Sequence, residues 1–231
     1  MARPLHPPEQ ISFLGAQALP VAEELERIRA AARDCRACPL GEIGTQTVFG
    51  VGPADARVMV VGEAPGEQED QQGVPFVGPA GRLFDRGLEQ AGLRRERIWV
   101  TNIVKHRPWE WQGGRKKNRA PKASEIKACR PWLEHELRLL HPQVIVCMGA
   151  TAAKALLGKE FRLTQQRGTW QQSDTAPHVL ATLHPAYILI QPPESYDRVL
   201  ESFFADLRQV AERCRELGLD AATPEAPPRS E

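Results

Sequence analysis

The stretch CRAC places two thiols where a single metal centre could bind both. Cys35 and Cys38 stand two residues apart, a spacing that lets one turn of chain present two thiolates to a metal. A lone CxxC pair is equally typical of a redox-active dithiol, so the spacing leaves both interpretations open. Five cysteines, an odd number, argue against a disulfide framework. Cys147, inside an apolar run, and Cys214, near the C-terminus, are interpreted as ordinary thiols.

Three apolar runs end in residues that could bind a planar ligand. Glu63 follows the first run within GEAPGEQED, where Gly62 and Gly66 let backbone amides approach a ligand closely. This stretch lacks the Lys and the glycine spacing of a P-loop, and its acidic side chains would repel a phosphate. Asn102 ends the second run and His184 follows the last. A planar heterocycle therefore suits these residues better than a phosphate.

Phe76, Asn102 and His184 each have a binding interpretation and a structural one. Phe76 could present an aromatic face at a pocket wall or could pack in the core. The Asn102 amide can donate and accept, as reading the edge of a base requires, but asparagine is also a common cap or turn residue. His184 could stabilise a developing anion or merely end a strand.

The stretch GGRKKNRAP gathers cations behind a glycine pair. It is either a solvated loop or a hinged surface that contacts DNA phosphates. The whole chain has 30 Lys and Arg, 29 Asp and Glu and a net charge of +1, so overall charge does not indicate a polyanionic partner. A nucleic-acid site must therefore be local, and its candidate cations are Arg115, Lys116, Lys117 and Arg119.

The elements that position these residues follow from apolar patterning. RVMVVGE, RIWVTNIV, PQVIVCMG and HVLATLHP are continuous rather than alternating, which is typical of strands buried on both faces. Stretches with helical periodicity lie between them. The alternation predicts an α/β fold, a three-layer sandwich with a central, mainly parallel four-stranded sheet. Because the carboxyl ends of parallel strands meet at one edge, we expect Glu63, Phe76, Asn102 and His184 to share a rim.

One domain is expected between two ends without periodicity. Residues 1–20 are predicted to form an extended arm, residues 21–217 the folded domain and residues 218–231 a disordered tail. With 231 residues the chain can bury a core without a metal. It shows no signal-peptide pattern and no apolar run of roughly 20 residues, so we expect a cytoplasmic monomer with no membrane partner.

Four motifs in order carry a resemblance to a known family. VMVVGEAPGEQED, GVPFVGPAG, WVTNIVK and LHPAYIL, together with the cysteines, resemble the uracil-DNA glycosylase superfamily, above all the iron-sulfur glycosylases of family 4 and their X-type relatives. The likeness runs from about Cys35 to the final helix. It implies a bacterial repair enzyme, associated with the nucleoid when acting, that flips uracil out of DNA and hydrolyses its N-glycosidic bond in base excision repair. Its partner would be uracil-containing DNA.

The resemblance also assigns roles at the rim. Phe76 would stack on the flipped uracil, Asn102 would bind its Watson–Crick edge and His184 would face its O2 atom. His184 suits stabilisation of the departing uracil anion, whereas Glu63 would support the cationic sugar or orient the attacking water. The expected uracil-binding residues are Gly62, Ala64, Glu69, Phe76 and Asn102.

Two departures from the family pattern affect binding. LHPAYILIQ resembles the loop that family members insert into the minor groove, which makes Leu189 the candidate wedge. The family pattern has Arg where this chain has Ile190, so a phosphate contact is in question. Ala64 stands where X-type members have Gln, which reduces base contacts there to the backbone.

The resemblance implies a metal centre with one unusual ligand. Family 4 takes two further cysteines, of which one corresponds to Cys129 and the other is replaced by His106, as in X-type relatives. Cys35, Cys38, His106 and Cys129 would therefore hold a 4Fe-4S cluster. Three thiolates and an imidazole are also a standard zinc set, and spacing does not separate the two.

X-type members end their basic loop in a His that attacks the deoxyribose and leaves the protein covalently bound to DNA. Here the nearest residues are Asn118 and Arg119. An amide nitrogen is no useful nucleophile, so we expect water to capture the sugar and the enzyme to turn over. The alternatives are an X-type protein that stays tightly or covalently attached to uracil-DNA, and a structural zinc protein with a different pocket. The expected DNA-binding residues are Arg115, Lys116, Lys117, Asn118, Arg119 and Leu189.

Overall fold

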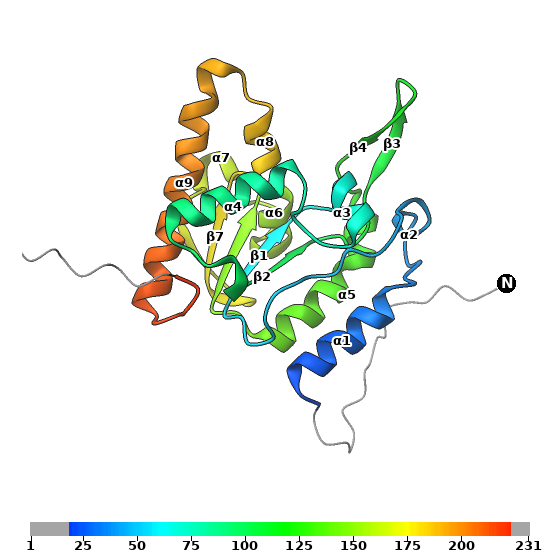
Figure 1. The fold of residues 1–231 in the computed structure, drawn as a ribbon, viewed down its shortest axis with the longest axis horizontal. Helices are drawn as coiled ribbons and strands as arrows, with labels where there is room; N and C mark the ends of the chain where they lie inside the picture. The colour runs from blue at the N-terminus through cyan, green and yellow to red at the C-terminus, as the bar shows by residue number, and fades with distance from the viewer. Residues whose placement is uncertain (1–18, 223–231) are drawn as a thin grey trace, which may run out of the picture.

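A computed structural model describes residues 19–222 of the chain, which contain one five-stranded sheet between layers of helices (Figure 1). The strands of this sheet are β1 (Val58–Gly62), β2 (Ile98–Asn102), β5 (Val144–Met148), β6 (Trp170–Ser173) and β7 (Ala176–Thr182). Their order is β2-β1-β5-β7-β6. All neighbours pair in parallel except β6, which runs antiparallel to β7. The α/β class and the mainly parallel sheet are confirmed.

The predicted number of four strands was wrong because β6 was missed. Its sequence, WQQS, is mostly polar and half-exposed at the edge of the sheet, so no apolar run marks it. The strands β1, β2 and β5 are buried along their whole length, as their continuous apolar runs predict. The register pairs Gly62 with Asn102 and Met148 with Thr182, which brings the carboxyl ends of the parallel strands to one edge.

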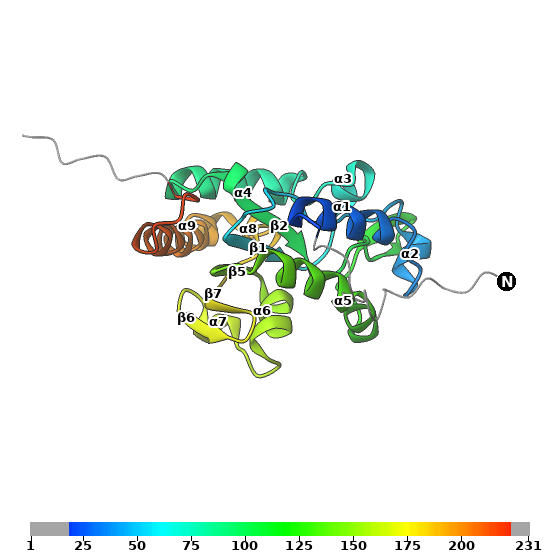
Figure 2. The same cartoon turned by 90° about the horizontal axis from the view of Figure 1, so that it is seen from below.

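Helices cover both faces of the sheet, as Figure 2 shows. On one face lie α4 (Pro79–Ala91), α8 (Pro185–Leu189) and α9 (Pro193–Glu216). On the other lie α5 (Ala123–Leu140), α6 (Ala150–Leu157) and α7 (Leu163–Gln166), and α1 (Val21–Ala32) packs on α5. Each face has its own apolar core, one built around Phe84 and Phe203 and the other around Trp132 and Ile145. Among helices in the described range, none is long and apolar enough to cross a membrane.

The basic stretch forms a hairpin rather than a loop. β3 (Trp109–Gln112) pairs antiparallel with β4 (Arg115–Asn118), and the pair projects from the body beside α2 (Leu40–Ile43) and α3 (Glu67–Gln72) (Figure 1). Gly113 and Gly114 have φ angles of 59° and 73°, which is typical of a two-residue hairpin turn. The interpretation of this glycine pair as a loop hinge is therefore replaced by that of a tight turn.

The predicted ends match the structure in part. Helix α1 begins at Val21, where the folded domain was expected to begin, and residues 1–18 of the predicted arm lie outside the described residues. The predicted tail was wrong over residues 218–222. Arg94, just before the short 3-10 helix η1 (Arg95–Arg97), donates its backbone N–H to the carbonyl of Ala221 at 2.7 Å, and Ala221 is 1% exposed. The rest of the tail, residues 223–231, lies outside the described part.

A buried ion pair joins the end of β2 to α5. The Lys105 ammonium lies 2.6 Å from a carboxylate oxygen of Glu136, and both side chains are at most 1% exposed. Lys105 also donates to the hydroxyl of Thr101 and the carbonyl of Asn102, at 2.5 and 3.0 Å. Glu136 further accepts the backbone N–H of Gly50 and the Thr101 hydroxyl. Because polar partners surround both charges, the pair is tolerated in the interior.

Replacing Glu136 by leucine should destabilise the protein strongly. The substitution leaves the Lys105 ammonium buried without a counter-charge, and breaking such a pair typically costs about 3–5 kcal/mol. Urea unfolding followed by circular dichroism should show a lower midpoint. The double variant Lys105→Met/Glu136→Leu should recover most of the loss, because it removes both charges. Equal midpoints for the wild type and Glu136→Leu would contradict this account.

Candidate active site

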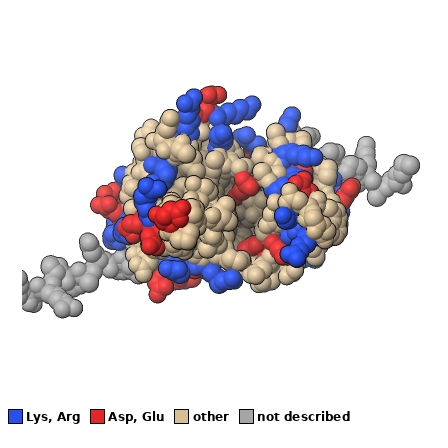
Figure 3. Space-filling view, turned by 90° about the horizontal axis from the view of Figure 1, so that it is seen from above, with Lys and Arg blue, Asp and Glu red and all other residues tan. Residues whose placement is uncertain are grey.

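A cavity of about 760 Å³ opens at the carboxyl ends of the parallel strands. Figure 3, which looks onto this face, shows the surface hollowed near its middle with acidic side chains at the edge of the hollow. The cavity lining includes the four residues expected to share a rim, Glu63, Phe76, Asn102 and His184. The topology therefore brings together side chains separated by up to 121 positions in the sequence (184 − 63).

Phe76 has an unusual backbone conformation and lies against two glycine residues. Its φ angle is 57°, in the left-handed region that side chains rarely adopt. A side chain at Gly62 would lie 2.7 Å from the Phe76 ring and 2.3 Å from the Asn102 amide oxygen. One at Gly81 would lie 1.9 Å from the Phe76 carbonyl oxygen. Glycine at both positions is therefore required for the ring to lie where it does.

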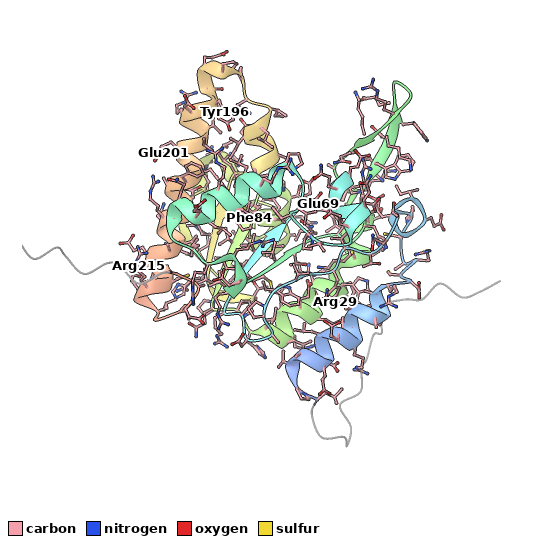
Figure 4. All side chains as sticks on the ribbon, viewed as in Figure 1. Arg29, Glu69, Phe84, Tyr196, Glu201 and Arg215 are labelled. Carbon is pink, nitrogen blue, oxygen red and sulfur yellow. The ribbon has the colours of Figure 1, made fainter. Side chains whose placement is uncertain are left out.

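Glu69 shapes the loops around Phe76. It is 8% exposed, lies on α3 (Figure 4), and its carboxylate accepts backbone N–H groups from Gly66, Val77 and Gly78 at 3.1, 2.9 and 2.7 Å. Charge-assisted hydrogen bonds of this kind are stronger than neutral ones, so one side chain fixes the two residues that follow Phe76 and joins them to Gly66. Glu69 lines the cavity, and its predicted contact with a base stays a prediction.

The Asn102 side chain presents an acceptor that lacks a partner. Asn102 is 2% exposed, and within residues 19–222 its Oδ1 atom has no hydrogen-bond partner. Buried polar atoms are nearly always satisfied, so an unpaired acceptor that lines a cavity is available to a water molecule or to a ligand that brings a hydrogen-bond donor. The backbone of Asn102 is fixed by Lys105, whose ammonium donates to its carbonyl at 3.0 Å.

His184 carries a neutral ring with a defined donor. The backbone N–H of Ala186 donates to Nδ1 at 3.1 Å, so in the neutral ring the proton is on Nε2. Burial lowers the pKa of His184 to about 4, against a smaller raising effect of Glu69. The ring lies 6.0 Å from that of Phe76, with 33° between the planes. His184 therefore offers the cavity wall an uncharged N–H donor at neutral pH.

Thr151 is a site residue that sequence reasoning missed. Its hydroxyl donates a short hydrogen bond to the carboxylate of Glu63 and so orients it, and Thr151 lines the same cavity. Thr151 lies in the first turn of α6, directly after β5. The signal was available, because β5 is also a parallel strand whose carboxyl end faces this edge, but the sequence there, MGAT, has no charged residue.

One side of the cavity mouth is formed by α8 and the residue after it. Leu189, the predicted wedge, is 42% exposed, and Ile190 beside it is 78% exposed. Both line the cavity together with Tyr187, which is 49% exposed. The structure thus presents apolar side chains to solvent at the place where insertion into DNA was predicted, and the wedge role stays a prediction.

The predicted DNA-binding residues divide into two groups. Arg115, Lys116 and Lys117 are exposed on β4, away from the body of the protein. Arg119 instead forms two hydrogen bonds with the Glu125 carboxylate, at 2.6 and 2.9 Å, and this contact is the main cause of the lowered pKa of Glu125.

Asn118 is likewise held at the base of the hairpin. Its side-chain oxygen accepts a hydrogen bond from the buried Arg107 guanidinium at 2.7 Å. Asn118 and Arg119 both line the cavity, but both are engaged with other side chains of the protein.

Three of the predicted metal ligands lie near one another. Cys35 and Cys129 lie in the same apolar core cluster, Cys38 packs against that cluster, and burial raises the pKa of the Cys129 thiol to about 12. The Trp132 indole donates to the sulfur of Cys35 at 3.4 Å, and the Lys105 backbone donates to that of Cys129 at 3.2 Å. In the described part of the chain, no three His, Cys, Asp or Glu side chains are already arranged around a metal position.

The fourth predicted ligand, His106, is oriented by a hydroxyl. Its Nε2 atom lies 3.0 Å from the hydroxyl oxygen of Thr47, which itself donates to the carbonyl of Ala32 at 2.7 Å. The Thr47 hydroxyl proton is thereby used, so Nε2 is the donor and Nδ1 keeps its lone pair. His106 is 4% exposed, and burial lowers its pKa to about 4. A neutral ring with one nitrogen held as a donor is the usual state of a ligating His.

The fold and the cavity define an α/β protein of the class that has its ligand cavity at the carboxyl edge of a parallel sheet. Residues 49–208 match the family described as the Uracil DNA glycosylase superfamily. The chain belongs to the uracil-DNA glycosylase superfamily, and its relatives place it with family 4.

Curated relatives are named Type-4 uracil-DNA glycosylase. That of Sulfurisphaera tokodaii is 36% identical over 197 residues, covering 82% of this chain and 86% of the relative. That of Thermotoga maritima is 39% identical over 168 residues, covering 72% and 84%. Among solved structures, SMUG2 of Pedobacter heparinus matches with a TM-score of 0.51 and 14% identity, over 68% of this chain and 77% of that one. The last match shows a shared fold.

The ring of His184 should stay neutral down to about pH 4, with the proton on Nε2. Nitrogen-15 NMR of the imidazole tests this, and His184→Gln assigns the signals. Since the pKa is lowered from 6.5 on folding, protonation favours the unfolded chain. The contribution of His184 to stability should therefore be lost as pH falls from 6.5 towards 4. A ring that titrates near pH 6.5 in the folded protein would contradict the assignment.

Proposed function

We propose that this protein is a uracil-DNA glycosylase that binds a flipped uracil in the cavity and hydrolyses its N-glycosidic bond, the first step of base excision repair. The observation that carries the proposal is the unpaired Oδ1 atom of Asn102 near the ring of Phe76. Uracil has an N–H group at N3 beside a carbonyl at C4, which matches an amide that accepts and donates. Cytosine has the reverse pattern, a lone pair at N3 beside an amino group at C4, so an amide held in the same orientation would face acceptor with acceptor and donor with donor. The Type-4 relatives and the family match support the same function.

Bond cleavage requires that the uracil ring accept the electron pair of the C1′–N1 bond. The negative charge is shared with O2, and the neutral Nε2–H of His184 is the donor available to stabilise it. With a pKa of about 4 the ring is not an imidazolium ion at neutral pH, so it donates a hydrogen bond to the leaving group and does not act as a general acid.

The sugar that remains is cationic and must be captured by a nucleophile. Glu63, oriented by Thr151, would stabilise that charge and accept the proton of a water molecule as its oxygen bonds to C1′. The residues at the base of the hairpin, Asn118 and Arg119, offer an amide and a paired guanidinium, neither of which is a useful nucleophile. The products are free uracil and an abasic site.

We also propose that Cys35, Cys38, His106 and Cys129 hold a 4Fe-4S cluster. The support is that the three cysteines belong to one apolar cluster, that N–H groups donate to two of their sulfurs, and that His106 keeps a free Nδ1 lone pair. When bound, the cluster would link three parts of the chain: the segment after α1, the loop after β2, and α5. Zinc has the same ligand preferences and is the competing occupant.

Asn102→Ala should release uracil about 10- to 100-fold more slowly than the wild type at unchanged thermal stability, because one buried hydrogen-bonding group is lost. The measurement is multiple-turnover release of uracil from a labelled oligonucleotide, with a cytosine oligonucleotide as the control. A denaturing gel run on the same samples tests the mechanism. A heat-stable protein–DNA band would show covalent attachment instead of turnover, and wild-type rates in Asn102→Ala would remove Asn102 from the site.

Protein purified without oxygen should be brown and contain iron and sulfide in equal amounts. Cys129→Ser should lower the iron content and the visible absorbance, because it removes one thiolate ligand. Cys147→Ser is the matched control, since Cys147 is also fully buried but lies in β5, outside the proposed ligand set. A colourless wild type with one zinc per chain would overturn the cluster in favour of zinc.

A further inference from the structure

The hairpin that rises beside the cavity carries an exposed aromatic ring. Trp111 is 67% exposed, although it is among the largest apolar side chains of the protein. Its neighbour Trp109 is anchored, since its indole donates to the carbonyl of Ile43 at 2.9 Å and Lys116 lies 4.1 Å from its ring. The two indoles are 5.7 Å apart and meet edge to face. Trp109 therefore fixes the hairpin, and Trp111 is left on the surface.

The register places Trp111 on the hairpin face that leads to the cavity. Trp111 pairs with Lys116 and Trp109 pairs with Asn118, so all four side chains share one face of the two-stranded sheet. Asn118 lines the cavity. Two residues of strand separate the two pairs, which is about 7 Å along the hairpin. Stacked nucleotides of one DNA strand rise about 3.4 Å each, so Trp111 lies about two nucleotides from the cavity.

One cation shares the hairpin face of this ring, and two more lie on the opposite face of the same hairpin. Lys116 pairs directly with Trp111, whereas the exposed Arg115 and Lys117, together with Glu110 opposite Lys117, alternate to the other face. An aromatic face among cations fits a single strand of nucleic acid, whose bases stack on the ring while its phosphates meet the positive charges. In a duplex the neighbouring bases are already stacked and paired, so they offer no free face.

We propose that Trp111 is a stacking platform for an unpaired base about two nucleotides from the target uracil, which makes single-stranded uracil-DNA the preferred substrate. The proposal rests on the function proposed above, because it takes the uracil in the cavity as the reference point. In this proposal Trp111 selects single-stranded DNA by contacting a base, whereas the cations of the hairpin bind phosphates whatever the strand type.

The test is the affinity for oligonucleotides that contain uracil on a 2′-fluorinated sugar, which resists cleavage, measured by fluorescence anisotropy. Trp111→Ala should raise Kd for the single strand by about 5- to 100-fold, the usual range for one base stacked on an aromatic ring. Kd for the duplex should change less than about 2-fold. Trp111→Phe should keep most of the affinity. Because Trp111 is exposed, the unfolding midpoint should not change.

Lys117→Ala is the matched control on the same hairpin. Loss of a phosphate contact should weaken single-strand and duplex binding and reduce the salt slope by about 1. A second control replaces the bases one to three nucleotides from uracil, on either side, by abasic analogues. The wild type should lose affinity on one of these substrates, and Trp111→Ala should lose nothing further there, because the stacking partner is already absent.

Two results would overturn the inference. One is an equal loss of affinity for single strand and duplex in Trp111→Ala. The other is unchanged DNA binding in Trp111→Ala, which would indicate that the exposed ring binds a protein partner instead. Uracil release by the wild type separates this inference from the function on which it rests. If uracil is released and Trp111→Ala binds like the wild type, the platform alone is wrong. If no uracil is released but the single-strand loss is seen, the proposed activity is wrong and the platform stands.

Discussion

The buried pair of Lys105 and Glu136 is the contact on which the arrangement of the site depends. Through its ammonium, Lys105 holds the carbonyl of Asn102, and through its backbone N–H it contacts the sulfur of Cys129. Its sequence neighbour is His106. One residue thus joins the proposed base-reading amide to the proposed metal ligands. Since a buried charge cannot lose its partner cheaply, the end of β2 has little freedom to shift. Burial of the two charges is unfavourable, but it fixes the backbone that carries the side-chain amide of Asn102.

The pocket is built from conformations that folding alone would disfavour. Phe76 is held at a φ of 57°, a conformation whose cost is of order 1–3 kcal/mol for a side-chain-bearing residue. The Oδ1 atom of Asn102 is buried without a partner in the described part of the chain, which adds a further cost. The three N–H groups that donate to Glu69 provide stabilisation in compensation, because they bond to a charged acceptor. The Asn102 acceptor gains a partner when a donor enters the cavity, so the desolvation of this atom is already complete before binding.

The sequence predicts those parts of the molecule that depend on one residue type or one period. Continuous apolar runs mark β1, β2, β5 and β7, and the rule for parallel strands is enough to bring Glu63, Asn102 and His184 to one cavity. Contacts between distant polar residues carry no such period. Nothing in the spacing of Lys105 and Glu136, 31 positions apart, indicates that they meet in the interior. The hairpin is a different case, since WEWQ alternates apolar and polar residues and the glycine pair after it is a turn signal, so the sequence does indicate this element.

The base of the hairpin explains why the same segment can serve binding without supplying a nucleophile. Arg119 is paired with Glu125 at the start of α5, and Asn118 accepts from Arg107, whose other nitrogen contacts Glu67 on α3. These contacts tie the base of the hairpin to two helices, α3 and α5. Asn118 and Arg119 therefore hold the hairpin in place, and moving either side chain to attack a sugar would break these contacts. Side chains that support the hairpin are not free to attack a sugar. This favours water as the group that captures the sugar.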